Sequence, residues 1–446
     1  MALESLITKV KSAIFSTGFD STAIVSRRKQ AHLVGILAFE VASLMTKLLH
    51  LWRCLSDAHL SHLRNHTIAL PSVRKLISDD DSFLLLLARS ELADSLRLVA
   101  DSVATLAHRC ADPALRHFHL SFHAFADSGQ DPNRWVMGWK DMETKLAKRM
   151  DRQVSTTAAL VREMDELSEA EQTLKKLVHG GGGSHLAMVT ELQQRIFWKK
   201  QQVKYLRQTS LWSSTFDAAV APLARAAFTV LARIKYAFCG GEPCPLPRAL
   251  SNSGFAAVFP SDDTASTLKP NCGFLALCSE TLNPTPSTLG AAALSLHYAN
   301  LIAVLEKMAR APRAVGAEAR EEVYAMLPAS VRAQLRARLR GVGWEACRDV
   351  RLAAEWRAAL ARIAEWLGPV AQDTIRWQGE RSFEGRRRTA SAPRANVLLL
   401  QTLHFADREK VEAAVTEILV GLNFLWRFQR EMATALGGTA GAALQQ

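Results

Sequence analysis

The chain has 446 residues, of which 48% are hydrophobic and 22% are charged, and this composition excludes a fibrous or wholly disordered protein. The length exceeds what one compact core usually supports, so we expect two or three domains. Lys and Arg number 55 against 43 Asp and Glu, which gives a formal net charge of +12. A basic surface favours acidic proteins, anionic lipid or nucleic acid as partners.

Cysteine usage and hydropathy indicate the compartment. The seven cysteines are scattered along the chain, which is typical of free thiols in a reducing environment. No segment has the order of a secretory signal peptide. The apolar stretch 31–51 contains Glu40 and Lys47, and charges are costly in lipid, so we interpret it as a buried helix. We therefore predict a protein of the nucleus or cytoplasm that is neither secreted nor transmembrane.

The N-terminal segment 1–26 contains an amphipathic stretch over residues 3–16, with apolar residues on one side and lysines beside them. One interpretation is a first helix that docks on its own domain. The other is a membrane-surface anchor or transit segment, which would place the chain at the periphery of the plasma membrane or in an organelle.

Helical periodicity dominates the chain and no alternating strand pattern is found, so the predicted fold class is all-α. A first helical domain is expected over 27–150, where Asp79 to Asp81 precede an apolar run and are interpreted as a helix cap. Long helices with heptad-like leucine spacing are expected over 151–238, interrupted by four glycines at Gly180 to Gly183. A coiled-coil dimer and a hairpin within one chain fit this pattern equally well.

The second half of the chain changes in composition. Residues 239–287 are rich in Pro, Gly and Ser and are predicted to be a flexible linker. Helical periodicity returns over 288–432, which we predict to be a C-terminal helical domain. Glycines in 433–446 predict a disordered tail. The expected architecture is two helical domains joined by long coiled-coil-like helices and a linker.

Catalytic signatures are not found: the sequence has no nucleophile elbow, dinucleotide fingerprint or zinc-protease histidine pair. Histidines gather in two clusters, His59, His62 and His66, and His117, His119 and His123. No carboxylate pattern accompanies either cluster, so both are interpreted as surface histidines and not as metal ligands. We predict no catalytic residue, metal site or cofactor.

Two polar residues, His297 and Asn300, interrupt an apolar helical stripe. The stripe consists of Leu294, Tyr298, Leu301, Leu305 and Met308. Buried polar side chains are normally hydrogen-bonded. We therefore expect His297 and Asn300 to be a buried polar pair that binds neighbouring helices.

A basic stripe is predicted on one C-terminal helix, where Arg332, Arg336 and Arg340 recur every four residues. Between residues 332 and 394 the chain has 14 Arg and no Lys. This excess supports an alternative function, a nuclear protein that contacts nucleic acid through its C-terminal domain. No aromatic interleaving accompanies the stripe, so an acidic protein partner or a solvated face is favoured.

The segment 386–393 reads RRRTASAP and is the sharpest local motif. Its members are Arg386, Arg387, Arg388, Thr389, Ser391 and Pro393. Arginine three residues before serine is the spacing that basophilic kinases read, and 14-3-3 proteins bind the phosphorylated motif with an arginine cluster. We predict Ser391, with Thr389, as a regulatory phosphosite inside a 14-3-3 docking motif. A solvated basic loop is the alternative.

Three blocks of sequence resemble the plant phytosulfokine-simulator (PSK simulator) family. They are residues 34–57 with 76–92, residues 286–308 with the run LHYANLI followed by residues 320–340, and residues 398–419 with the run LHFADREK. The resemblance implies two uncharacterised helical domains, a role in growth and cell proliferation downstream of hormone signalling, and no enzymatic activity. Some members of that family carry an N-terminal myristoylation signal. This chain begins Met1-Ala2, so that modification is not expected and the chain resembles a divergent branch.

The function predicted from these observations is a non-enzymatic plant growth regulator that acts as an interaction or scaffold protein in hormone signalling. Signalling proteins, among them 14-3-3 proteins and a basophilic kinase, are the expected partners. Nucleic-acid binding and weak membrane association are the alternatives. The oligomeric state is left open by the sequence.

Overall fold

The computed structural model describes residues 33–179, 186–238, 273–312, 315–340, 349–381 and 397–443. Over these ranges the chain is helical and has no β-strand, only isolated bridges between Leu33 and Thr215 and between Thr288 and Asp407. The predicted all-α fold class is confirmed. Residues 3–16 lie outside the described part of the chain, so their predicted role stays a prediction.

The described residues form two compact units. Unit one consists of residues 33–50, 98–179 and 186–230, and unit two consists of 51–97, 231–238 and the described residues from 273 onward. The helices α3 (Ala38–Cys54), α6 (Asp81–Ala107) and α12 (Phe216–Phe238) contribute residues to both units. This partition differs from the sequence boundaries, because packing groups residues 51–97 with C-terminal helices instead of with the rest of 27–150.

Unit one is built around an aromatic cluster. Its remaining elements are η1 (Gly35–Leu37), α7 (Pro113–Arg116), α8 (Phe118–Ser128), α9 (Trp139–Asp141), η3 (Met142–Ala147), α10 (Lys148–His179), α11 (Leu186–Thr209) and η5 (Leu211–Ser213). Phe118, Phe122 and Phe125 recur along one face of α8, and their ring centroids lie 6.0, 5.6 and 5.0 Å from that of Phe228 on α12. Trp135 completes the cluster at 4.8 Å from Phe228. These contacts fix the rotation of α8 about its own axis.

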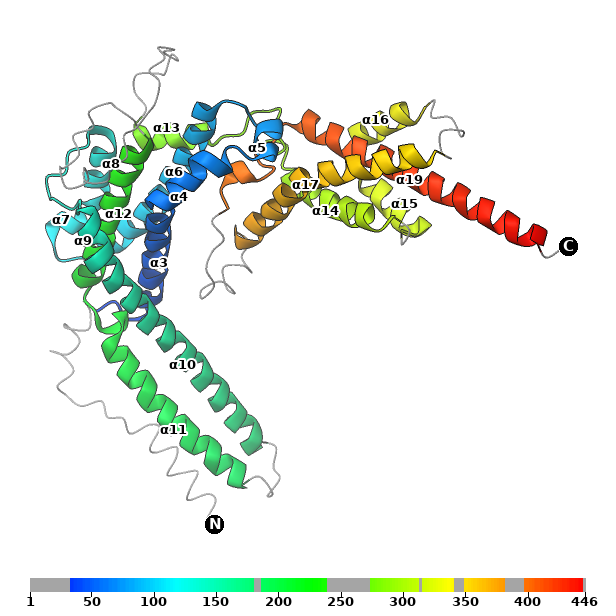
Figure 1. The fold of residues 1–446 in the computed structure, drawn as a ribbon. Coiled ribbons are helices and arrows are strands. Elements are labelled where there is room, and N and C mark those ends of the chain that lie inside the picture. The colour runs from blue at the N-terminus through cyan, green and yellow to red at the C-terminus, as the bar shows by residue number, and fades with distance from the viewer. Residues whose placement is uncertain are drawn as a thin grey trace. The chain divides into compact units, whose positions relative to one another are not determined.

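The helices α10 and α11 lie side by side as a hairpin (Figure 1). Leu160 on α10 and Val203 and Leu206 on α11 are buried against each other. An ion pair between Lys199 Nζ and Glu163 Oε2, 2.7 Å apart, lies beside this apolar contact. Of the two arrangements that the heptad-like spacing left open, the structure contains the hairpin within one chain.

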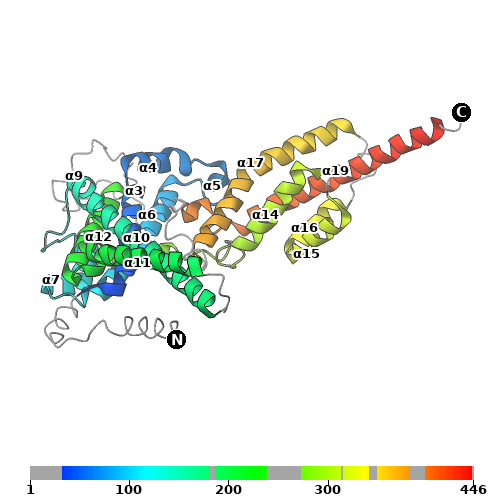
Figure 2. The ribbon, with the colours of Figure 1, turned by 90° about the horizontal axis from the view of Figure 1, so that it is seen from below.

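Unit two contains the C-terminal helices. Its elements are α4 (Asp57–His62), η2 (Leu63–Thr67), α5 (Pro71–Leu76), α13 (Phe274–Thr281), α14 (Ser295–Arg310), α15 (Ala317–Met326), α16 (Ala329–Leu339), α17 (Val350–Arg381), η9 (Leu399–Gln401) and α19 (Arg408–Ala443). The helices α14, α17 and α19 pack on one another around buried Leu305, Leu367 and Leu422 (Figure 2). The expected stripe of α14 is therefore the face that forms this core.

Two segments of unit two are more helical than the sequence predicted. The helix α13 lies within the predicted linker and buries Leu275 and Cys278, because a short apolar run there is long enough for two turns. The helix α19 continues to Ala443, past the predicted domain end at 432. Alanines flank the glycines of that segment, and alanine has the highest helix propensity.

The apolar stretch that includes α3 was the sequence candidate for a membrane span. The helical stretch Gly35–Cys54 is long and apolar enough to cross a membrane, and 50% of its most apolar 18 residues are buried inside the protein. Val41, Met45 and Leu48 are each fully buried. A core helix has these same properties, which agrees with the interpretation of this stretch as a buried helix.

Candidate functional site

The three sequence blocks that carry the family resemblance meet in unit two around the segment 398–407, which connects α17 to α19. Leu399 N donates a hydrogen bond to Glu91 Oε2 at 2.7 Å. Asp407 N donates to Leu76 O at 2.8 Å. Leu76 and Glu91 belong to the first block, so the first and third blocks are bonded to each other.

The second block joins the same segment through the turn before α14. Leu289 N donates to Ala406 O at 3.0 Å, and Gly290 N donates to His404 O at 2.9 Å. A Cβ atom at position 290 would collide with the backbone oxygen and the ring of His404. Glycine at position 290 therefore permits the close approach of the two segments. All three blocks form one junction, which we call the three-block junction.

A buried carboxylate lies at the centre of the contact between α14, α16 and α19. Glu412 Oε1 accepts hydrogen bonds from Tyr298 Oη, from Ser330 Oγ and from Arg408 Nε, each at 2.8 Å. The Glu412 side chain is only 5% exposed. A buried charge is tolerated when several donors satisfy it.

These contacts determine the protonation of the carboxylate and the phenol. Burial acts to raise the pKa of Glu412, but the hydrogen bonds from Arg408, Tyr298 and Ser330 outweigh it, and the pKa is lowered from its usual value. Burial and the bond to Glu412 raise the pKa of Tyr298 far above its usual value. The pair is therefore a carboxylate bound to a neutral phenol. This state holds helices together and has no acid or base poised near neutral pH.

The predicted polar pair is only half correct. His297 is partly buried, and its Nε2 donates to Met326 O at 2.9 Å, which links α14 to the end of α15. Asn300 is exposed, because it lies about 120° around the helix from Leu294 at the centre of the stripe. The buried polar group that the sequence reading missed is the hydroxyl of Tyr298. A Tyr inside an apolar stripe was the signal, since a buried phenol needs a partner.

The predicted basic stripe is partly engaged within unit two. Arg332 Nε donates to Leu327 O at 2.9 Å, and Arg336 Nη2 donates to Tyr324 Oη at 2.8 Å. Arg340 is exposed at the end of α16. Two of the three guanidinium groups thus connect α16 to the preceding helix, and Arg336 is exposed as Arg340 is.

Within each of the two predicted histidine clusters, the individual histidines make different contacts. In the first, Ser56 Oγ lies 2.7 Å from His59 Nδ1 at the start of α4, and the rings of His62 and His66 stack at 5.1 Å. In the second, His119 and His123 on α8 have ring centroids 4.5 Å apart.

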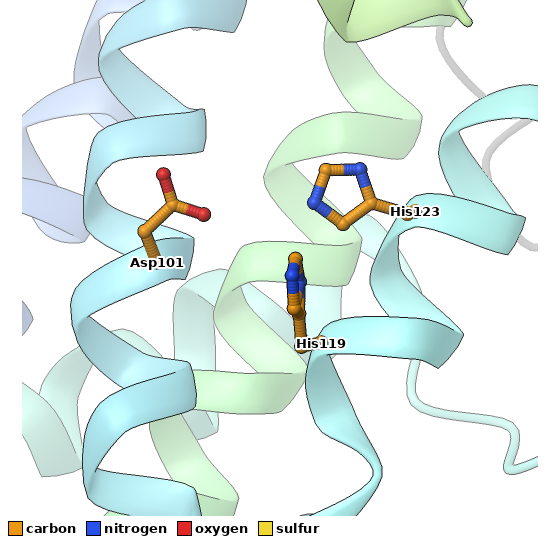
Figure 3. A group of neighbouring side chains, drawn as sticks. All are labelled: Asp101, His119 and His123. Atoms are coloured by element: carbon orange, nitrogen blue, oxygen red, sulfur yellow. The ribbon is translucent and has the colours of Figure 1, made fainter.

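Figure 3 shows the carboxylate of Asp101 on α6 facing the His119 and His123 rings. One potential ligand atom from each of the three residues lies within 4.8 Å of the other two. His117 does not belong to this group, and its Nδ1 lies 2.7 Å from Pro113 O. The carboxylate that the sequence reading did not find comes from another helix, eighteen positions before His119 in the chain.

Two of the three described cysteines, Cys54 and Cys110, are thiols of low reactivity. Cys54, Cys110 and Cys278 form no disulfide. Burial, with the nearby Glu91 carboxylate, raises the pKa of Cys54 to about 11. Burial and Asp217 raise the pKa of Cys110 to about 12. Neither thiol would ionise to a nucleophilic thiolate at neutral pH.

The predicted phosphosite and docking motif, Arg386 to Pro393, lies outside the described residues. Its role stays a prediction from the sequence.

Comparison with known proteins gives two family matches and several relatives. Residues 288–376 match the family described as "Protein of unknown function (DUF668)", and residues 36–92 match "Domain of unknown function (DUF3475)". Protein PSK SIMULATOR 1 of Arabidopsis thaliana is 26% identical over 439 residues, which cover 95% of this chain and 60% of the relative. Protein PSK SIMULATOR 2, from the same plant, is 26% identical over 90% of this chain and 61% of its own length.

Protein PSK SIMULATOR 3 of Arabidopsis thaliana is 24% identical over 95% of this chain, which again spans 60% of the relative. The chain thus spans about 60% of the length of the curated relatives it matches. No solved structure gives a significant match. Both family matches include residues of the three-block junction, and the relatives align along nearly the whole chain. The chain is therefore similar to the PSK simulator proteins along nearly its whole length.

Proposed function

We propose that this chain is a non-enzymatic regulator of plant growth, related to phytosulfokine signalling, which acts by binding other proteins. The names of the three relatives supply the signalling context. The protonation of Glu412 and Tyr298, and the high pKa values of Cys54 and Cys110, support a binding role over a catalytic one.

The observation that carries the binding role is the outer surface of α11. Trp198 is 63% exposed, Tyr205 is 59% exposed and Phe197 is 56% exposed. Large aromatic side chains of this kind are enriched in the energetically dominant parts of interfaces. Exposure of three of them on one helix marks an interaction surface.

The charge of α11 indicates the chemistry of the partner. The helix carries five basic residues and one acidic residue, namely Arg195, Lys199, Lys200, Lys204, Arg207 and Glu191. Lys199 forms an ion pair with Glu163 within the hairpin, whereas Arg195 and Lys204 are exposed. An acidic protein segment with apolar side chains complements this aromatic and basic surface.

The test replaces Trp198 and Tyr205 together with Ala and compares the double variant with Leu120→Ala. Leu120 is 69% exposed on α8 and makes a matched control for the loss of exposed apolar area. Both variants are expected to keep native helical content by circular dichroism. Each is expressed in plants that lack the endogenous protein, and its partners and the growth response to phytosulfokine are measured.

We expect the α11 variant to lose specific partners and the growth response, while the Leu120 variant keeps both. An α11 variant with unchanged partners and a full growth response would refute the role of this surface.

Regulation through the 386–393 motif is part of the proposal. Phosphorylation of Ser391 adds a charge of about −2 and three acceptor oxygens, which an arginine cluster binds tightly. We expect Ser391→Ala to remove 14-3-3 binding in a pull-down after kinase treatment. Ser382→Ala is the control, because position 379, three residues before it, is glycine. Equal 14-3-3 binding by both variants would remove the motif from the proposal.

The nuclear, nucleic-acid alternative is not favoured by the described residues, since Arg332 and Arg336 are bonded within unit two. A nuclear and cytoplasmic location is part of the proposed growth-regulator function, and imaging of a tagged chain tests it. Deleting residues 1–26 distinguishes this location from peripheral attachment at a membrane, because only a membrane-bound pool would be released.

A further inference from the structure

We propose that Asp101, His119 and His123 bind a divalent transition-metal ion of the zinc class on unit one. The ion would connect α6 to α8. This inference goes beyond the proposed function and does not rest on it, because it uses no residue of α11 or of the 386–393 motif.

The first support is the position of the two histidines. Phe118 and Phe122 face Phe228 and hold α8 in one rotation. His119 and His123 each follow one of these phenylalanines and therefore share the neighbouring face, one turn apart. Their spacing of four residues places both imidazoles on the same side of α8, as metal-binding histidine pairs on helices require.

The second support is the carboxylate supplied by α6. Ala100 and Ala104 are buried on this helix, and Asp101 lies at the edge of that buried face. Its carboxylate and the imidazoles face one another in Figure 3, and one potential ligand atom from each residue lies within 4.8 Å of the other two. At metal–ligand distances of about 2.1 Å, ligand atoms lie about 3.4 Å apart, so modest side-chain rotations complete the site.

The chemistry of the three ligands selects the class of metal. Imidazole suits zinc, copper, iron and nickel, whereas magnesium and calcium prefer oxygen ligands. Three protein ligands leave coordination positions for water or for a side chain of a partner. His119 is exposed and His123 is partly buried, so the site is open to solvent and to exchange of the ion.

The chain contains its own control. His62 and His66 have the same four-residue spacing, and their rings stack at 5.1 Å. Among the residues that the structure describes, this pair does not belong to any group of three potential ligands. Comparison with this pair therefore distinguishes zinc binding by a three-ligand site from the general affinity of two neighbouring histidines for zinc.

The experiment titrates the full, metal-stripped chain with zinc against a chromophoric chelator, after alkylation of accessible thiols. Cobalt absorption then reports the coordination of the ion. The variants are His119→Gln, Asp101→Asn and the control His62→Gln. Circular dichroism and the melting temperature of the metal-free variants verify that each one folds.

We expect one zinc equivalent in the wild type and in His62→Gln, with a rise in melting temperature, because a ligand that binds only the native state stabilises it. His119→Gln and Asp101→Asn should each weaken that equivalent at least about tenfold and lose the rise. Absence of zinc binding in the wild type would overturn the proposal and leave the group as an ion pair or hydrogen bond. Equal weakening by His62→Gln would overturn it too.

Discussion

The two units fix the orientation of one of their helices, α8 and α14, by different kinds of contact. In unit one, α8 is held by tilted and edge-on aromatic rings around Phe228. In unit two, α14 is held by its apolar stripe and by the Tyr298 hydroxyl bound to the buried carboxylate of Glu412. Apolar contacts are non-directional and scale with buried area. A buried carboxylate is directional and is stable only while all its donors are present.

This difference bears on how each region tolerates change. The aromatic cluster should accept substitutions that conserve volume. The Glu412 network should resist even isosteric replacements, because one lost donor leaves a polar group unpaired. The network also lies beside the three-block junction, where segments from distant parts of the sequence must align.

Among the variants that test this comparison, Phe228→Ala is expected to lose the most unfolding free energy. Phe228 is fully buried, and truncation of a buried Phe costs about 4 kcal/mol through lost burial and the cavity left behind. Denaturant unfolding measures the loss, and hydrogen exchange should rise in α8 more than in α14. Leu120→Ala, on the exposed side of α8, should stay within about 0.5 kcal/mol of wild type. A small loss in Phe228→Ala would show that α8 is held by something else.

The next effect is expected from Glu412→Ala, which leaves Tyr298, Ser330 and Arg408 without their common acceptor. Removing one partner of a buried charged network costs about 3 kcal/mol. Hydrogen exchange should now rise in α14 and α16 before α8. Glu409→Ala is the control, because Glu409 is exposed in the same turn of α19. Faster exchange in α8 than in α14 would contradict the assignment of Glu412 to this contact.

A third test compares two glycines within unit two. A Cβ at Gly421 would lie 2.7 Å from Trp356 Cε3, so Gly421→Ala should destabilise the protein by about 2 kcal/mol through overpacking. Gly379 is exposed in α17, with nothing within 4 Å of an added Cβ. Gly379→Ala should stabilise by about 0.5 kcal/mol, because alanine is the better helix former. Equal effects of the two changes would contradict the close packing of α19 on α17.

The smallest effect is the pH dependence of the Glu412 contact. The pKa of Glu412 is lowered below its usual 4.5 in the folded protein. Its stability contribution is therefore complete above the unfolded-state pKa and is lost as pH falls through the folded-state pKa. The difference in unfolding free energy between wild type and Glu412→Gln should stay constant from about pH 7 to pH 5 and narrow below. A difference that widens on acidification would mean that the pKa of Glu412 is raised in the folded protein and not lowered.

The sequence by itself determined the local structure. Apolar spacing identified the buried face of α14, and the acidic run before α6 identified a helix cap, where Ser82 N donates to Asp80 Oδ1 at 2.9 Å. The family resemblance also came from the sequence, through runs that contain Tyr298 and Arg408. Periodicity and capping are properties of a few consecutive residues, so they are readable without knowledge of the rest of the chain.

Only the tertiary structure decided which polar groups meet. Asn300 is exposed while Tyr298 bonds Glu412, which is 114 positions away along the chain. Asp101 joins His119 and His123 from a different helix, so a search for ligands at short spacing could not find it. A helical pattern shows which face of a helix is buried, but the partner of that face depends on how distant segments pack. That choice is made by the combined burial and hydrogen bonding of the whole unit.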